Sequence, residues 1–240
     1  WIYQSERFPV LKHGPLIAAF ALAGAALPVL TENRAPDWTG ALIAVAASLL
    51  FFLELRIADE HKDHKDDCRF RPERPVPRGL VSLAELRWVA LAAALIQAAL
   101  AWAYAPALLA PLALTWAWMG LMTVEFFAPN WLKRRPALYL ASHMLVLPLI
   151  AAFAMAAAWG QSSLAANAPI IAFLALAFSN GVVIELARKS WARAEERRWV
   201  DTYSKLWGPE RAAALIAGAI VASVALTLVV LGGARVAIWF

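Results

Sequence analysis

Long runs of apolar residues alternate with short charged segments along this chain. Residues 88–124 contain no acidic or basic side chain, and residues 136–184 contain none apart from one histidine. A membrane-spanning helix needs about 20 apolar residues, so each of these stretches is long enough to supply two spans. Pro106 and Pro111 predict a bend within the first stretch, and residues 160–169 predict a bend within the second.

Three further apolar runs, near residues 15–31, 39–57 and 211–232, bring the expected number of spans to seven. Because lipid offers the backbone no hydrogen-bonding partners, spans of this kind are helices. We therefore expect an all-α fold, a polytopic transmembrane helical bundle, with residues 1–240 forming a single domain. The sequence opens at Trp1 without a methionine, which suggests that it is trimmed or partial.

Composition and charge agree with a membrane protein, since 62% of the residues are hydrophobic. Lys and Arg gather in the N-terminal segment and in the loops after the second, fourth and sixth spans, whereas the intervening loops carry Arg34 alone. The positive-inside rule places the basic loops in the cytoplasm, and we expect a bacterial inner-membrane location. The net charge of +5 could indicate nucleic acid. The basic residues lie beside the spans among acids, however, which favours anionic lipid or a diphosphate.

Acidic residues recur at the end of the second span with helical spacing. Asp59, Asp63 and Asp67 occupy positions i, i+4 and i+8, so on a helix their carboxylates share one stripe. Each like-charged pair at this spacing costs a few tenths of a kcal/mol unless a cation lies over the stripe. A divalent cation is one candidate, and a solvated helix end whose acids are offset by Lys62 and Lys65 is the alternative.

A proline-rich run with paired arginines follows these acids: Arg71-Pro72-Glu73-Arg74-Pro75-Val76-Pro77. Together the acids and this run resemble the first signature of the UbiA superfamily of intramembrane prenyltransferases, N-D-x-x-D-x-x-x-D followed by R-P-x-R-P-L-P. Asp59 stands where the family has Asn, and Glu60 stands where it has the adjacent Asp, so both positions keep an oxygen ligand. The family normally has nine spans, so the resemblance implies that the last two are missing from this chain or absent from its subgroup.

The resemblance implies a Mg²⁺- or Mn²⁺-dependent transferase that moves an isoprenyl group from a prenyl diphosphate to an aromatic or lipid-like acceptor. Asp59, Asp63 and Asp67 would bind the metal, with Asp63 and Asp67 as the catalytic pair. Arg71 and Arg74 would hold the diphosphate bidentately, a geometry that Lys cannot reproduce. Lys133 is a further expected diphosphate contact, because the family often has a basic pair after the fourth span.

The second signature of the family is present only in outline after the sixth span. Glu185 and Glu195 are the expected metal ligands there, although pairing with neighbouring arginines is an equal alternative for both. The alignment needs a one-residue deletion and places Lys189 where the family has Asp. We therefore expect Lys189 to contact the diphosphate as a point charge rather than to hold a second metal ion.

Other interpretations of the same residues stay open. His61 and His64 could bind a transition metal, but the surrounding carboxylates favour Mg²⁺ or Mn²⁺. Glu54 and Glu125 lie near span ends, where an acid either is functional or extends its carboxylate to the interface. A non-catalytic binding or assembly subunit with a UbiA-like fold is one alternative function, and a small-molecule transporter is another. Membrane lipids are expected partners, and nucleic acid is not.

Overall fold

The computed structural model describes residues 2–32, 35–159, 167–197 and 200–238, and within these ranges it contains helices and no strand. The chain divides into two compact units, each considered below by itself. The first unit comprises Trp1–Pro129 and Leu149–Leu164, and the second comprises Asn130–Pro148 and Ala165–Phe240.

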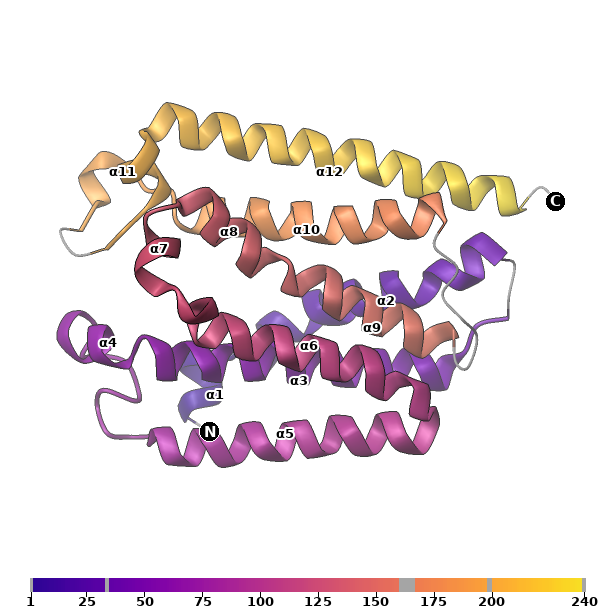
Figure 1. Cartoon of the computed structure of the whole chain (residues 1–240), viewed down its shortest axis with the longest axis horizontal. Coiled ribbons are helices and arrows are strands. Elements are labelled where there is room, and N and C mark those ends of the chain that lie inside the picture. The colour runs from indigo at the N-terminus through magenta and orange to yellow at the C-terminus, as the bar shows by residue number, and fades with distance from the viewer. Residues whose placement is uncertain (1, 33–34, 160–166, 198–199, 239–240) are drawn as a thin grey trace. The chain divides into compact units, whose positions relative to one another are not determined.

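In the described residues, the first unit contains six α-helices and part of a seventh (Figure 1). They are α1 (Ile2–Arg7), α2 (Val10–Glu32), α3 (Trp38–Lys62), α4 (His64–Phe70), α5 (Leu83–Tyr104), α6 (Leu109–Thr123) and the larger part of α9 (Val146–Trp159). Helix α3 is the central one, because α2, α5 and α6 pack against it and Phe153 of α9 meets Phe51 edge to face at 5.5 Å. The acidic segment therefore continues directly from the central helix of this unit.

The second unit contains the helices that follow α6 and α9. They are α8 (Pro136–Met144), α10 (Ala168–Arg188), α11 (Tyr203–Trp207) and α12 (Pro209–Ile238), with the short α7 (Pro129–Lys133) at the boundary. Helix α10 packs along α12 and also contacts α8. The Ser223 hydroxyl donates to Ser179 Oγ at 2.9 Å, and Ser179 in turn donates to the Ala219 carbonyl at 3.0 Å. Hydrogen bonds between small residues are a usual way to join helices in lipid.

Seven helices in the described part of the chain are long and apolar enough to cross a membrane, which confirms the expected fold. They cover Val10–Thr31, Trp38–Lys62, Leu83–Tyr104, Pro106–Thr123, Pro136–Trp159, Ala168–Arg188 and Pro209–Gly233. The bend expected at Pro106 occurs as a short 3₁₀ turn over Pro106–Leu108, whereas Pro111 lies in the first turn of α6. The second expected bend falls mostly on residues 160–166, outside the described residues.

Polar side chains at the helix starts explain several boundaries. Ser82 and Glu85 form a capping box at the start of α5, in which each side chain accepts a hydrogen bond from the backbone N–H of the other residue. Asp37 accepts the Gly40 N–H at 2.9 Å before α3, and Asn167 accepts the Ile170 N–H at 3.0 Å before α10. These side chains satisfy N–H groups that a helix leaves without internal partners.

Helix α3 also depends on a glycine where α9 approaches it. A β-carbon added at Gly40 would lie 2.3 Å from the Ala157 carbonyl oxygen and 2.9 Å from the Tyr104 hydroxyl. We expect Gly40→Ala to lower the stability of the protein by about 2–3 kcal/mol, because backbone atoms of α9 must move. Thermal unfolding in detergent measures this loss.

Gly120 in α6 provides the matched control, since a β-carbon there would meet no atom within 4 Å. Gly120→Ala should be neutral or should raise stability by up to about 1 kcal/mol, because Ala favours a helix over Gly. Equal melting temperatures for the two variants would contradict the close approach of α3 and α9.

Candidate functional site

The acidic segment keeps its helical spacing across a break between α3 and α4. Helix α3 ends at Lys62, and Asp63 takes φ −92° and ψ 2° before α4 begins at His64. The Asp63 N–H nevertheless donates to the Asp59 carbonyl at 2.9 Å, and the Asp67 N–H donates to the Asp63 carbonyl at 2.8 Å. The three acids therefore follow one another at one-turn intervals, although not on the single uninterrupted helix that the spacing alone suggests.

Exposure differs sharply among the three acids. Asp59 is exposed, Asp63 is half-buried, and Asp67 has only 2% of its surface accessible. An isolated carboxylate is costly to bury, so Asp67 needs positively charged partners. Both partners come from the proline-rich run that follows it.

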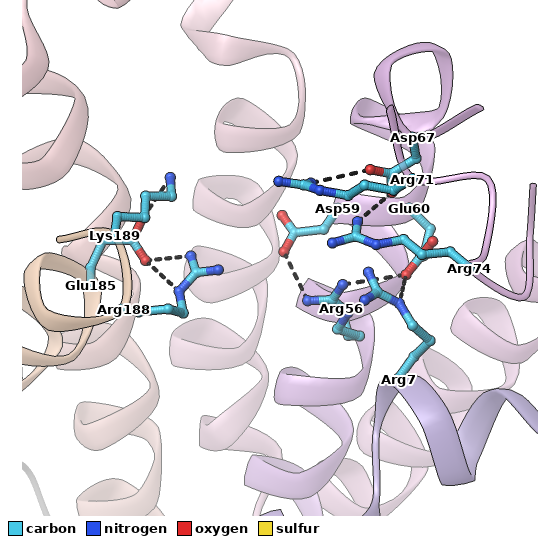
Figure 2. A network of polar contacts seen from close by, with 10 residues as sticks. All are labelled: Arg7, Arg56, Asp59, Glu60, Asp67, Arg71, Arg74, Glu185, Arg188 and Lys189. Atoms are coloured by element: carbon cyan, nitrogen blue, oxygen red, sulfur yellow. Dashed lines mark hydrogen bonds and ion pairs between the residues drawn. The ribbon is translucent and has the colours of Figure 1, made fainter. Parts of the chain in front are cut away.

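Asp67 holds Arg71 and Arg74 with one carboxylate oxygen each (Figure 2). Arg71 Nη1 lies 3.2 Å from Oδ1, and Arg74 Nη1 lies 2.5 Å from Oδ2. The Arg71 N–H also donates to the Asp67 carbonyl at 2.8 Å, and the Arg74 N–H donates to the Arg71 carbonyl at 3.1 Å. One buried acid thus orders two guanidinium groups, each of which keeps further N–H donors.

This arrangement bears on the metal-binding roles expected from the sequence. Among the residues that the structure describes, no three His, Cys, Asp or Glu side chains come close enough together to hold a metal ion. Both Asp67 oxygens contact guanidinium groups, whereas Asp59 is open to solvent with Arg56 at 3.8 Å. Asp67 therefore stands as the residue that positions Arg71 and Arg74, and it differs from Asp59 and Asp63 in being almost fully buried.

Glu60 takes a position that sequence reasoning missed. The resemblance predicts an oxygen ligand beside Asp59, but the Glu60 carboxylate is buried, with 2% exposed surface, and faces two arginines (Figure 2). Arg7 Nε of α1 lies 2.6 Å from Oε1, and Arg56 Nη2 lies 3.4 Å from the same oxygen. Arg7 is more than 50 residues away in the sequence, so no local spacing could have indicated this pair.

Two further acids of the first unit, Glu54 and Glu125, are buried. Glu125 is 7% exposed, its Oε1 lies 3.8 Å from Lys62 Nζ, and its Oε2 has no hydrogen-bond partner. It opens a run of three consecutive residues with positive φ, which continues through Phe126 and Phe127. Such strained backbone persists only where the surrounding structure holds it. Glu54 in α3 is also buried, with 7% exposed surface.

The second unit contains the other residues expected from the sequence. Glu185 is ion-paired with Lys189 at 2.8 Å and with Arg188 at 2.5 Å (Figure 2), which is the pairing alternative that the sequence left open. Lys133 is exposed at the end of α7, and Glu195 is exposed in the 3₁₀ turn Arg193–Glu195. No ion pair within the described residues joins Lys133 or Glu195 to the Glu185 cluster.

The loop after α10 is organised by hydrogen bonds to Glu196. Thr202 and Ser204 both donate hydroxyl hydrogen bonds to Glu196 Oε1 at 2.6 Å, and Ser204 Oγ accepts the Trp191 N–H at 2.8 Å. The bonds from Ser204 and Thr202 lower the pKa of the Glu196 carboxyl below its ordinary value. Glu196 thus shapes this loop, a role that the sequence had not distinguished from that of its neighbour Glu195.

Burial also affects an aromatic side chain beside the ion pairs of the second unit. Tyr203 packs in a cluster with Leu140, Leu186 and Ala212, and its N–H donates to the Lys189 carbonyl at 2.8 Å. Burial, with a smaller effect from Glu185, raises the pKa of the Tyr203 phenol. The phenol is therefore protonated at neutral pH, and the backbone bond ties α11 to the end of α10.

Comparisons with known proteins show a matching family and a solved structure with a similar fold. The model of the UbiA prenyltransferase family matches residues 17–240. A solved structure described as "Structural and mechanistic insights into the biosynthesis of Digeranylgeranylglyceryl phosphate synthase in membranes" has a TM-score of 0.59 to this chain at 12% sequence identity. The match covers 89% of this chain and 72% of that chain, and at this identity it concerns the fold. Comparison with curated protein sequences finds no match.

Proposed function

The chain belongs to the UbiA prenyltransferase family, and on this premise we propose that it transfers an isoprenyl group from a prenyl diphosphate to an aromatic or lipid-like acceptor. The observation that carries the proposal is the pair of guanidinium groups that Asp67 orders beside Asp59 and Asp63. Carboxylates and paired guanidiniums in one segment are the groups that a metal-bound diphosphate requires.

Recognition of the diphosphate follows from the charges of this segment. Asp67 neutralises one of the two positive charges of Arg71 and Arg74, so the trio keeps one net positive charge. Each guanidinium uses one Nη1 hydrogen bond for Asp67, and its other donors can bond phosphate oxygens. Because Arg71 and Arg74 are already ordered, less side-chain entropy is lost when the diphosphate binds.

Asp59 and Asp63 fit a magnesium ion by their chemistry and their number. Mg²⁺ prefers oxygen ligands and is commonly held by one or two carboxylates together with substrate phosphates and water. The two residues lie one helical turn apart, joined by the bond from the Asp63 N–H to the Asp59 carbonyl. When bound there, Mg²⁺ or Mn²⁺ would neutralise charge on the diphosphate and make it a better leaving group.

In the proposed reaction, one bond to the allylic carbon breaks and another forms. The bond between the allylic carbon and the diphosphate oxygen breaks, and its electron pair leaves with the diphosphate. Arg71 and Arg74 stabilise the negative charge that develops on the leaving oxygens. The acceptor forms the new bond to the allylic carbon and loses a proton, while apolar helices keep water from the electron-deficient carbon.

We further propose that the acidic loops lie on the cytoplasmic side of a bacterial inner membrane, from the distribution of Lys and Arg.

A second candidate function is diphosphate binding without catalysis. The observation in its favour is the pairing of Glu185, an expected metal ligand of the second signature, with both Lys189 and Arg188. Such a protein would bind prenyl diphosphate but would not release pyrophosphate.

One assay separates the two candidates. The purified protein in liposomes is incubated with Mg²⁺, a radiolabelled prenyl diphosphate and a panel of aromatic and lipid acceptors. We expect stoichiometric release of pyrophosphate and transfer of label to one acceptor class. Saturable binding without pyrophosphate release would support the binding subunit, and absence of binding would refute both candidates.

A further inference from the structure

The short N-terminal helix α1 lies against the candidate site through three of its six residues. Arg7 reaches Glu60 of α3 at 2.6 Å, and Glu6 accepts two hydrogen bonds from Arg78 Nη2 at 2.7 and 2.8 Å. Tyr3 is buried in a cluster with Ile57, Val76 and Leu86. These contacts join residues that are far apart in the sequence, so they are tertiary and not a consequence of local helix formation.

The segment that carries the paired arginines has little regular structure of its own. After Arg74 the chain follows turns, in which the Arg78 N–H donates to the Arg74 carbonyl at 3.0 Å and the Leu80 N–H donates to the Pro75 carbonyl at 3.0 Å. Gly79 takes a positive φ of 73° at the end of these turns. Such a segment needs tertiary anchors to hold its side chains in place.

Helix α1 supplies two of these anchors. Val76, between Arg74 and Arg78, packs in the cluster with Tyr3, and Arg78 is ion-paired with Glu6. The third contact, between Arg7 and the buried Glu60, fixes α1 to the helix that carries Asp59. Helix α1 therefore connects the acids on one side with the arginine-bearing segment on the other.

We propose that α1 is a positioning element of the diphosphate site, which sets the place of Arg71 and Arg74 relative to Asp59 and Asp63 through Tyr3, Glu6 and Arg7. This inference rests on the proposed function, because it assigns α1 a part in diphosphate binding. Glu6, Arg7 and Tyr3 act through other residues and do not touch the substrate. The placement of binding groups must be accurate to within about 0.5 Å, so loss of these contacts weakens binding without removing any binding group.

A charge exchange at the pair between Glu6 and Arg78 tests the proposal. Glu6→Arg and Arg78→Glu should each raise the KM for prenyl diphosphate by about fivefold, with kcat nearly unchanged, because an exposed ion pair has a modest effect. The double variant with both substitutions should restore KM to within about twofold of the wild type. Arg87→Glu makes the same charge change on an exposed arginine of α5 and should leave KM unaltered.

Tyr3 gives an independent second test. Its hydroxyl has no hydrogen-bond partner in the structure, so Tyr3→Phe should retain the wild-type KM. Tyr3→Ala removes the ring that packs near Val76 and should raise KM by about tenfold, since small misplacements of binding groups reduce rates strongly.

The rate of hydrogen exchange at the amides of residues 78–80 reports how well the turns of this segment are held, and its measurement needs no catalytic activity. Exchange should rise in Glu6→Arg and in Tyr3→Ala and should be unchanged in Arg87→Glu and Tyr3→Phe. Unchanged exchange in the first two variants would overturn the proposal, and so would faster exchange with an unaltered KM. If the wild type neither binds nor cleaves prenyl diphosphate, the proposed function fails, and the exchange data then assign α1 a structural role alone.

Discussion

Asp67→Asn should reduce the kcat/KM of prenyl transfer by about 100-fold or more. Asn keeps the size of the side chain but removes the charge that Arg71 and Arg74 share at 3.2 and 2.5 Å. Removing one partner from a buried ion pair typically costs about 3–5 kcal/mol, and each 1.4 kcal/mol corresponds to a tenfold change. The two guanidiniums would repel each other and lose the geometry that recognises the diphosphate.

Asp66→Asn is the matched control for this substitution. Asp66 is the preceding residue in the same helix, and it is exposed. Its replacement should change kcat/KM by less than about twofold, since surface substitutions have small effects. Transfer assays in liposomes at several Mg²⁺ concentrations compare the two variants.

The magnesium titration also separates two roles for Asp67. If Asp67 positions the arginines, added Mg²⁺ will not restore the activity of Asp67→Asn. If it is instead a metal ligand, as the family resemblance implies, raised Mg²⁺ will recover part of the activity. Wild-type activity in Asp67→Asn at low Mg²⁺ would contradict both roles.

Asp63→Ala should lower transfer activity by about 100- to 1,000-fold and should shift the Mg²⁺ requirement to higher concentrations. Under the proposed function Asp63 and Asp59 hold the ion, and stabilisation of transition-state charge by a metal ion is a large part of catalysis in such sites. Chelation with EDTA should abolish wild-type activity, and Mg²⁺ or Mn²⁺ should restore it.

His64→Ala is the control that distinguishes the kind of metal. His64 lies next to Asp63, but a hard cation prefers oxygen over imidazole nitrogen. Activity should therefore survive this substitution. Loss of activity in His64→Ala together with rescue by Zn²⁺ would indicate a transition-metal site, and full activity in Asp63→Ala would refute the assignment of the acidic segment.

The number and position of the spans could be predicted from the sequence. Stretches such as residues 88–124 are long enough for two spans and carry no charge, so the membrane requirement of about 20 apolar residues decides the fold class without tertiary information. The acidic segment and the paired arginines were also recognisable, because Asp59, Asp63 and Asp67 follow a local helical period that survives the break at Asp63.

Other features became apparent only in the folded chain. The spacing of the acids gives Asp59, Asp63 and Asp67 equal standing, and only the folded chain buries Asp67 beneath two arginines while Asp59 stays exposed. Lys62 is a second example, because one sequence alternative placed it beside the neighbouring acids, and only the folded chain shows that it also lies 3.8 Å from Glu125.

The sequence by itself determined which segments enter the membrane and which residue types gather at their ends, since hydrophobic length and helical period are properties of neighbouring residues. The tertiary structure alone decided which charges of distant segments meet. Glu60 is buried against Arg7, and α1 reaches the arginine-bearing segment through Arg78, because burial and ion pairing arise where helices distant in sequence meet.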